Sequence, residues 1–320
     1  SDVCSSDLYV AQCEKNLNES MNLFPFKKDN EKCREVFLNR LKDAVHFAIP
    51  DGGVILDDDY KGVAGQPVRL PFPLITTQYY INGGELDADK ARSTKRVCLA
   101  QEVTTEYLKK HFPNPFLSKF EDDYIWIMVL AAAYFDEDKF WGLDPCGFVF
   151  PSQWDFDFDF QNTVEMNLAK NGTRINGYPI YILEELFEMV LKTEGENAAM
   201  GLIRDASSET ASILALCEAL TCTNVMHKPM ETIDPRVNER RIRDGKVPMY
   251  ETRVLWINVP GNEGSQADSQ GGSHKSPKQH LRRGHIRRLS SGKNVWVNST
   301  IVGAKENGYV EKQYAIRKAA

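Results

Sequence analysis

The chain has 320 residues, of which 42% are hydrophobic and 26% charged, and its net charge is −6. This length can bury a sizeable core and ordinarily forms about two domains, and the composition is typical of a soluble globular protein. The longest apolar run, residues 124–135, is shorter than the roughly 18 residues that a membrane-spanning helix needs. We therefore expect no membrane partner.

The first eight residues, SDVCSSDL, resemble the translated adapter sequence that contaminates many assembled metagenomic reading frames. They lack the charged, apolar and small-residue regions of a signal peptide. We expect residues 1–21 to be a non-native or disordered segment and the native N-terminus to be missing.

Residues 22–230 are predicted to form an acidic α+β body that opens with a helix. Apolar residues recur at helical spacing in 29–49, and the sequence Pro-Asp-Gly-Gly at 50–53 ends the pattern. Short strand-like runs follow at 54–56, 68–81, 96–100 and 124–135. Pro71 and Pro73 cannot donate to a ladder, so their run predicts an edge or bent strand. The pattern indicates a mainly antiparallel sheet with flanking helices.

Two amphipathic helices are predicted next, in residues 178–192 and 207–222, with Ser208 as the N-cap of the second. Apolar stripes at this spacing usually face a core, and Cys217 and Cys222 are expected to be buried in it. The seven cysteines contain no C-x-x-C pair. This argues against a zinc ribbon or a disulfide framework and indicates a reducing cytoplasm.

Residues 231–320 are predicted to form a C-terminal module of one helix and four antiparallel strands, which completes an α+β fold. Pro235 begins the helix, which ends at Arg243. The strands are expected at 250–259, 285–289, 295–298 and 309–316. Gly, Ser and Gln dominate residues 261–279, which predicts a mobile loop.

The charge is divided unevenly between the two parts. Residues 236–320 hold 17 Lys and Arg against 7 Asp and Glu, a net of +10, whereas residues 1–235 hold 22 against 38, a net of −16. Such asymmetry favours an anionic partner for the C-terminal module, either nucleic acid, RNA first, or an acidic protein. The alternative is that the acidic body covers the basic module.

The basic residues concentrate in KQHLRRGHIRRLSSGKNVWVNSTIVG at 278–303. Strand alternation there puts Arg283, His285 and Arg287 on one face, with Gly284 as a bulge. Arginine forks match phosphate, and flanking cations favour a neutral histidine that can act as a base. The candidate nucleic-acid-binding residues are Arg282, Arg283, Arg287, Arg288 and Lys293. The alternative is a solvated strand whose arginines pair with carboxylates.

The elements L-R-R-G-H-I-R-R-L, V-W-V and T-I-V-G, with Y-E-T-R-V-L-W-I and V-R-L-P-F-P upstream, resemble a group of bacteriophage and mobile-element proteins. The similarity runs from about Ile49 to Arg317 and is strongest in the last 80 residues. It implies a phage context and no particular reaction.

The order of one helix and four strands also resembles, in architecture alone, the ribonucleases that include barnase, the EndoU enzymes and RelE toxins. The resemblance implies metal-independent RNA cleavage. His285 would be the base or acid, His280 its partner and Thr300 a positioning hydroxyl, with the neighbouring cations on the phosphate. Three hypotheses stay open: nucleic-acid binding, a protein-interaction or regulatory module, and a ribonuclease.

Other signals predict no cofactor and no metal. Asp155, Asp157 and Asp159 share a strand face, but Phe160 and Met166 replace the glycine and glutamate of a calcium loop. These carboxylates are expected to dock the arginines instead. No phosphate-binding loop, dinucleotide fingerprint or hydrolase elbow occurs. The isolated His46 and His227 are expected to be structural.

Overall fold

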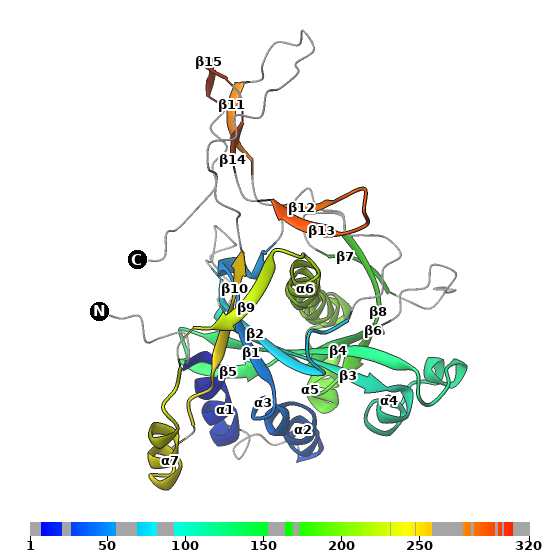
Figure 1. The fold of residues 1–320 in the computed structure, drawn as a ribbon. Coiled ribbons are helices and arrows are strands. Elements are labelled where there is room, and N and C mark those ends of the chain that lie inside the picture. Colours follow the sequence, from blue (N-terminus) through cyan, green and yellow to red (C-terminus); the bar gives the residue numbers. More distant parts are fainter. Residues whose placement is uncertain are drawn as a thin grey trace.

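The computed structural model describes residues 8–20, 27–55, 69–81, 93–152, 164–168, 173–230, 232–246, 248–257, 278–282, 285–297, 300–302 and 304–309. A mixed sheet of ten strands forms its centre, in the order β7-β8-β6-β4-β3-β2-β1-β10-β9, with β5 also paired to β4 (Figure 1). The pairing is antiparallel except at β1, which runs parallel to β2 and to β10. The predicted α+β class with a mainly antiparallel sheet is confirmed.

The strands of this sheet are β1 Val45–Ala48, β2 Leu74–Tyr80, β3 Ser93–Thr104, β4 Ile125–Phe135, β5 Phe140–Leu143, β6 Cys146–Pro151, β7 Val164–Leu168, β8 Thr173–Tyr181, β9 Val225–Pro229 and β10 Thr252–Ile257. The helical elements are α1 Leu8–Ser20, α2 Lys27–Cys33, η2 Arg34–Leu38, α3 Asn39–Leu41, η3 Asp51–Gly53, α4 Thr105–His111, η4 Pro115–Lys119, α5 Glu184–Thr193, α6 Glu196–Leu220 and α7 Pro235–Arg243.

Helices cover both faces of the sheet. Figure 1 shows α1, α2, α3 and α4 on one side and α6 on the other. Strand β4 explains this sandwich, because its side chains alternate between the two faces. Trp126, Met128 and Leu130 pack with the N-terminal helices, whereas Ile127 and Val129 pack with α6. A strand buried on both sides is continuously apolar, as predicted for 124–135.

Several predicted elements are wrong at their boundaries. The helical pattern of 29–49 ends at Leu41, and Val45–Ala48 forms β1 between two distant strands. Helix α6 begins at Glu196, with Gly195 as its N-cap, so Ser208 lies inside the helix. Residues 178–181 end strand β8 rather than opening a helix, and residues 54–55 form no strand. Long-range pairing overrides local periodicity at β1 and at the end of β8.

The N-terminal prediction is also wrong in part. Residues 8–20 form α1 rather than a disordered segment. Val10, Cys13 and Leu17 of this helix are buried in the core that it shares with β3 and β4. Burial of Val10 and of Leu17 stabilises the fold by about 1.5–3 kcal/mol each relative to an exposed side chain.

The predicted C-terminal module is divided among three sheets. Strand β10 belongs to the large sheet, between β1 and β9. A hairpin pairs β12 His285–Arg288 with β13 Asn294–Val297. A third sheet places β11 Lys278–Arg282 between β14 Thr300–Val302 and β15 Ala304–Tyr309.

Of the predicted mobile loop 261–279, residues 278 and 279 belong to β11, and the others lie outside the described residues. The predicted strand 309–316 is described only at Tyr309, which ends β15. Helix α7 follows the prediction closely, because Pro235 opens it and Asp234 caps it by accepting from the Arg236 backbone N–H.

Candidate functional site

The β12–β13 hairpin, which carries the predicted binding residues, is packed onto the body of the protein. Ile286 is 8% exposed and lies in a cluster with the buried residues Cys222 and Val225, to which Trp296 adds its partly buried ring. Leu255 of β10 packs against the same cluster. The hairpin therefore has an apolar inner side that is fixed to the end of α6 and to the strands β9 and β10.

Hydrogen bonds lock the hairpin in register with the turn after α6. The backbone N–H of Trp296 donates to Asn224 Oδ1 at 2.7 Å, and Asn224 Nδ2 donates to the Trp296 carbonyl at 2.9 Å. The Thr223 backbone N–H donates to the Asn294 carbonyl at 3.0 Å, and Asn294 Nδ2 donates to Thr221 Oγ1 at 3.1 Å. Four polar contacts thus hold one strand of the hairpin on one short turn.

The cations of this hairpin face solvent. Arg287, Arg288 and Lys293 are exposed, and none of the ion pairs formed within the described chain includes them. Residues 269–305 contain eight Lys and Arg and no Asp or Glu. Positive charge on the hairpin is therefore not neutralised by the described carboxylates, and Arg287 and Arg288 can offer guanidinium forks to an anion.

The other predicted site residues lie on different sheets or outside the described part. His285 stands opposite Val297 in the β12–β13 register. His280 stands opposite Val302, and Arg282 opposite Thr300, in the β11–β14 register. The two histidines of the ribonuclease hypothesis therefore belong to separate sheets. Arg283, and the carboxylates predicted to dock it at 155–159, lie outside the described residues.

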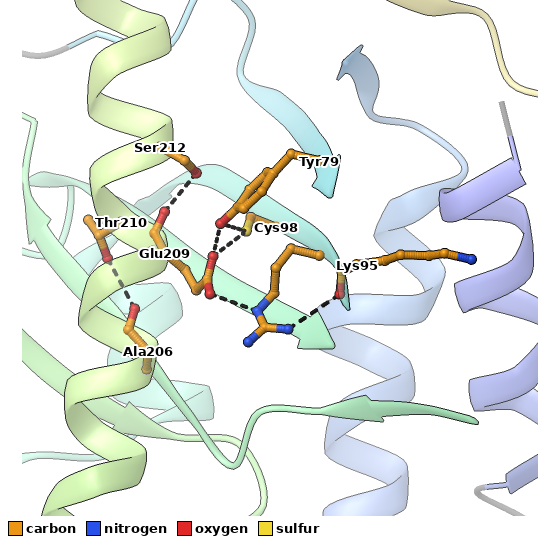
Figure 2. A network of polar contacts seen from close by, with 8 residues as sticks. Tyr79, Lys95, Cys98, Ala206, Glu209, Thr210 and Ser212 are labelled. Atoms are coloured by element: carbon orange, nitrogen blue, oxygen red, sulfur yellow. Dashed lines mark hydrogen bonds and ion pairs between the residues drawn. The ribbon is translucent and has the colours of Figure 1, made fainter. Parts of the chain in front are cut away.

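A buried polar cluster on α6 escaped the prediction. Glu209 is 4% exposed and accepts hydrogen bonds from Arg96 Nε at 2.8 Å, from Cys98 Sγ at 3.4 Å and from the Tyr79 hydroxyl (Figure 2). Its position four residues before Ile213 places it on the core-facing stripe of the helix. A carboxyl group at a core-facing position requires buried hydrogen-bond partners. A glutamate in an otherwise apolar stripe is therefore the sequence signal from which this cluster could have been predicted.

The electrostatics of this cluster favour a structural role, and they bring the pKa values of its carboxyl groups close to neutral pH. Burial raises the pKa of Glu209 to about 8, and the adjacent Arg96 guanidinium opposes this shift by favouring the carboxylate. Burial also raises the pKa of Asp144 to about 7, against the attraction of Arg96 and with the help of Asp205. The pKa of Cys98 rises to about 12 through burial, so its thiol is no nucleophile at neutral pH.

His46 and His227 lie in packed surroundings, as expected for structural histidines. His46 is buried, its Nδ1 is 2.6 Å from Thr76 Oγ1, and burial lowers its pKa to about 4. His227 makes edge contacts with the rings of Phe47 and Phe72.

No family model, no curated protein and no solved structure matches the chain. The likeness to phage proteins therefore stays a prediction. Within the described ranges, no three or more His, Cys, Asp or Glu side chains are grouped so that they could hold a metal ion. Among the helices that the structure describes, none is both long and apolar enough to cross a membrane.

Proposed function

We propose that the protein binds nucleic acid, RNA first, through the cations of the β12–β13 hairpin. The observation that carries this proposal is the exposure of Arg287, Arg288 and Lys293 on a hairpin that packing and hydrogen bonds hold in place. Phosphate contacts from Arg and Lys position a protein on nucleic acid without requiring a particular base sequence. Because the backbone of the hairpin is already fixed, only the cationic side chains must be ordered when the nucleic acid binds, which favours affinity.

The local charge matters because the whole chain has a net charge of −6 and would repel nucleic acid on average. The nucleic-acid strand must therefore contact the basic C-terminal region rather than the acidic body. We place this activity in a cytoplasmic phage or mobile-element protein. That setting is supported by the resemblance of the last 80 residues and by the six described cysteines, which are free and buried.

The ribonuclease hypothesis gains no support from the arrangement of the strands, because His280 and His285 are on different sheets. The remaining rival is an acidic protein partner, which would use the same exposed cations. A competition measurement separates the two ligands. Fluorescence anisotropy of a short labelled RNA, in low salt, is measured with polyglutamate or with unlabelled RNA as competitor.

We expect unlabelled RNA to displace the labelled probe more effectively than polyglutamate does. When concentrations are expressed per charged group, far less RNA phosphate than polyglutamate carboxylate should be needed. Absence of any RNA complex at low ionic strength would overturn the proposal. Equal competition by polyglutamate would assign the hairpin to acidic proteins. His285→Ala is included in the same assay to test the ribonuclease hypothesis. If the wild-type protein leaves the RNA intact in metal-free buffer, that hypothesis is excluded, whatever the result with the variant.

A further inference from the structure

A cavity of about 330 Å³ opens between the N-terminal helices and α4. Glu35 and Arg40 line it from η2 and α3, and Tyr107, Lys110 and His111 line it from α4. In Figure 1 these helices lie at the opposite end of the molecule from the β12–β13 hairpin. The cavity is therefore separate from the site of the proposed function.

The local backbone explains how these side chains converge. Residues Arg34–Leu38 form a π-helical turn whose Val36, Phe37 and Leu38 are buried, which leaves Glu35 on the outer side. Such turns occur often at functional sites. Across the cavity, buried Leu108 anchors α4, and Tyr107 and His111, one turn apart, pack with ring centroids 4.4 Å apart.

The charges around His111 are mainly positive. Burial lowers the pKa of this imidazole, and Lys110, Arg40 and Lys32 lower it further. Only Glu35 opposes them, with its Oε1 3.6 Å from His111 Nε2. Burial, helped by three surrounding cations, therefore lowers the pKa of His111, whereas the Glu35 carboxylate favours the protonated imidazole.

Two of these cations are available to a ligand. Lys32 is occupied, because its ammonium group donates to the Tyr181 carbonyl at 2.6 Å and lies 3.7 Å from Glu184. Arg40 and Lys110 take part in none of the ion pairs within the described chain. Arg40 instead lies beside Tyr107, where it opposes the burial that raises the pKa of the phenol.

We propose that this cavity binds a phosphate monoester, held by Arg40 and Lys110, and that His111 takes up a proton as the dianion enters. The charges then balance, because two cations and an imidazolium face the dianion and Glu35. The Arg40 guanidinium fork and the Lys110 ammonium group supply directed, charge-assisted hydrogen bonds. Glu106, also at the cavity, is exposed and stays solvated. The volume lies near the lower limit for small-molecule sites, which suits a ligand no larger than a mononucleotide.

The phosphate could belong to a small phosphate ester or to the 5′ end of a nucleic-acid strand. NMR titration of the His111 ring signals, assigned with His111→Gln, follows the proton directly. The probes are inorganic phosphate, 5′-AMP, adenosine, and one oligonucleotide with either a 5′-phosphate or a 5′-hydroxyl. We expect a phosphate-bearing probe to raise the His111 pKa by about one unit, which corresponds to tenfold coupling between proton and ligand. Adenosine should leave it unchanged.

A shift with 5′-AMP identifies small esters as ligands, whereas a shift only with the 5′-phosphorylated strand identifies strand ends. Lys110→Gln should weaken phosphate binding several-fold. Lys109→Gln is the matched control, because Lys109 is on the same helix but pairs with Asp122 at 2.7 Å outside the cavity. No His111 shift with any phosphate probe, or equal weakening by Lys109→Gln, would overturn the proposal. RNA binding by the hairpin is measured separately and does not depend on this result.

Discussion

Asn224 and Trp296 are joined by two hydrogen bonds, in which the Asn224 side-chain amide pairs with both backbone polar groups of Trp296. The side-chain amide of Asn224 thus makes the two hydrogen bonds that a neighbouring β-strand would otherwise make with Trp296, and it joins β13 to the body of the protein. The basic hairpin therefore depends on an uncharged side chain for its position. This dependence allows the position of the cations to be tested without changing their number.

Asn224→Ala should weaken RNA binding several-fold even though it removes no charge, because the hairpin loses its fixed position. Two hydrogen bonds of ordinary strength stabilise the docked hairpin by about 1–3 kcal/mol. Hydrogen exchange of the Trp296 amide should become correspondingly faster. The matched control is Asn238→Ala, since Asn238 makes the same pair of bonds, both 2.8 Å, with Met249 beside α7. Equal loss of RNA binding in both variants would contradict the role of the hairpin.

Stability should fall as pH rises from about 4.5 to about 8 because of Glu209. Its pKa is raised from 4.5 to about 8, so in this window the folded protein holds a proton that the unfolded chain releases. Rising pH then favours the unfolded chain. Glu209→Gln should flatten this part of the stability curve in urea unfolding, and Asp144, with a pKa of about 7, accounts for a residual slope. An unchanged slope in the variant would show that Arg96 keeps Glu209 ionised throughout.

His46 should produce the opposite trend in acid. Its pKa is lowered from 6.5 to about 4, so between these pH values His46 is protonated in the unfolded chain but neutral in the folded protein. Stability is therefore lost as pH falls through this window. His46→Gln removes this contribution, and the free energy of unfolding of the wild type minus that of the variant should decrease from pH 6.5 to pH 4. A constant difference would mean that buried His46 already carries a proton.

Gly53→Ala should destabilise the protein more than Gly245→Ala. Both glycines have positive φ, 69° and 68°, so the backbone strain of a side chain is about the same, of order 1 kcal/mol. A Cβ at Gly53 would lie 2.8 Å from the ring of Tyr79, whereas nothing lies within 4 Å at Gly245. The additional loss at Gly53 reports the cost of moving Tyr79, which donates to Glu209. Similar melting temperatures of the two variants would show that the ring moves freely.

Local signals in the sequence predict some elements well. The apolar run of β4 predicts a buried strand or a core helix, and the structure shows the strand; the proline and aspartate at the start of α7 define its first turn. The strands predicted at 285–289 and 295–298 lie close to β12 and β13, which a turn containing Ser-Ser-Gly joins. Gly292 indeed has a positive φ of 80° there.

Features that depend on distant partners could not be predicted in the same way. Four residues of β1 become a strand only because β2 and β10 lie on either side of them. Arg96 and Tyr79 meet Glu209 across separations of 113 and 130 residues. The cavity near His111 likewise combines two chain segments far apart in sequence, and no local pattern indicates it.

The salt dependence of RNA binding tests the role of the hairpin most directly. Log affinity of the wild type for single-stranded RNA should fall linearly with log salt between about 50 and about 200 mM, by about 0.7 per phosphate contact. Arg287→Gln, Arg288→Gln and Lys293→Gln combined should reduce this slope by about 2. The control variant Arg236→Gln, Arg243→Gln and Lys246→Gln removes three equally exposed charges near α7 and should leave the slope unchanged. Equal reductions in both variants would show that binding follows net charge alone, and an unchanged slope in the hairpin variant would contradict the assigned site.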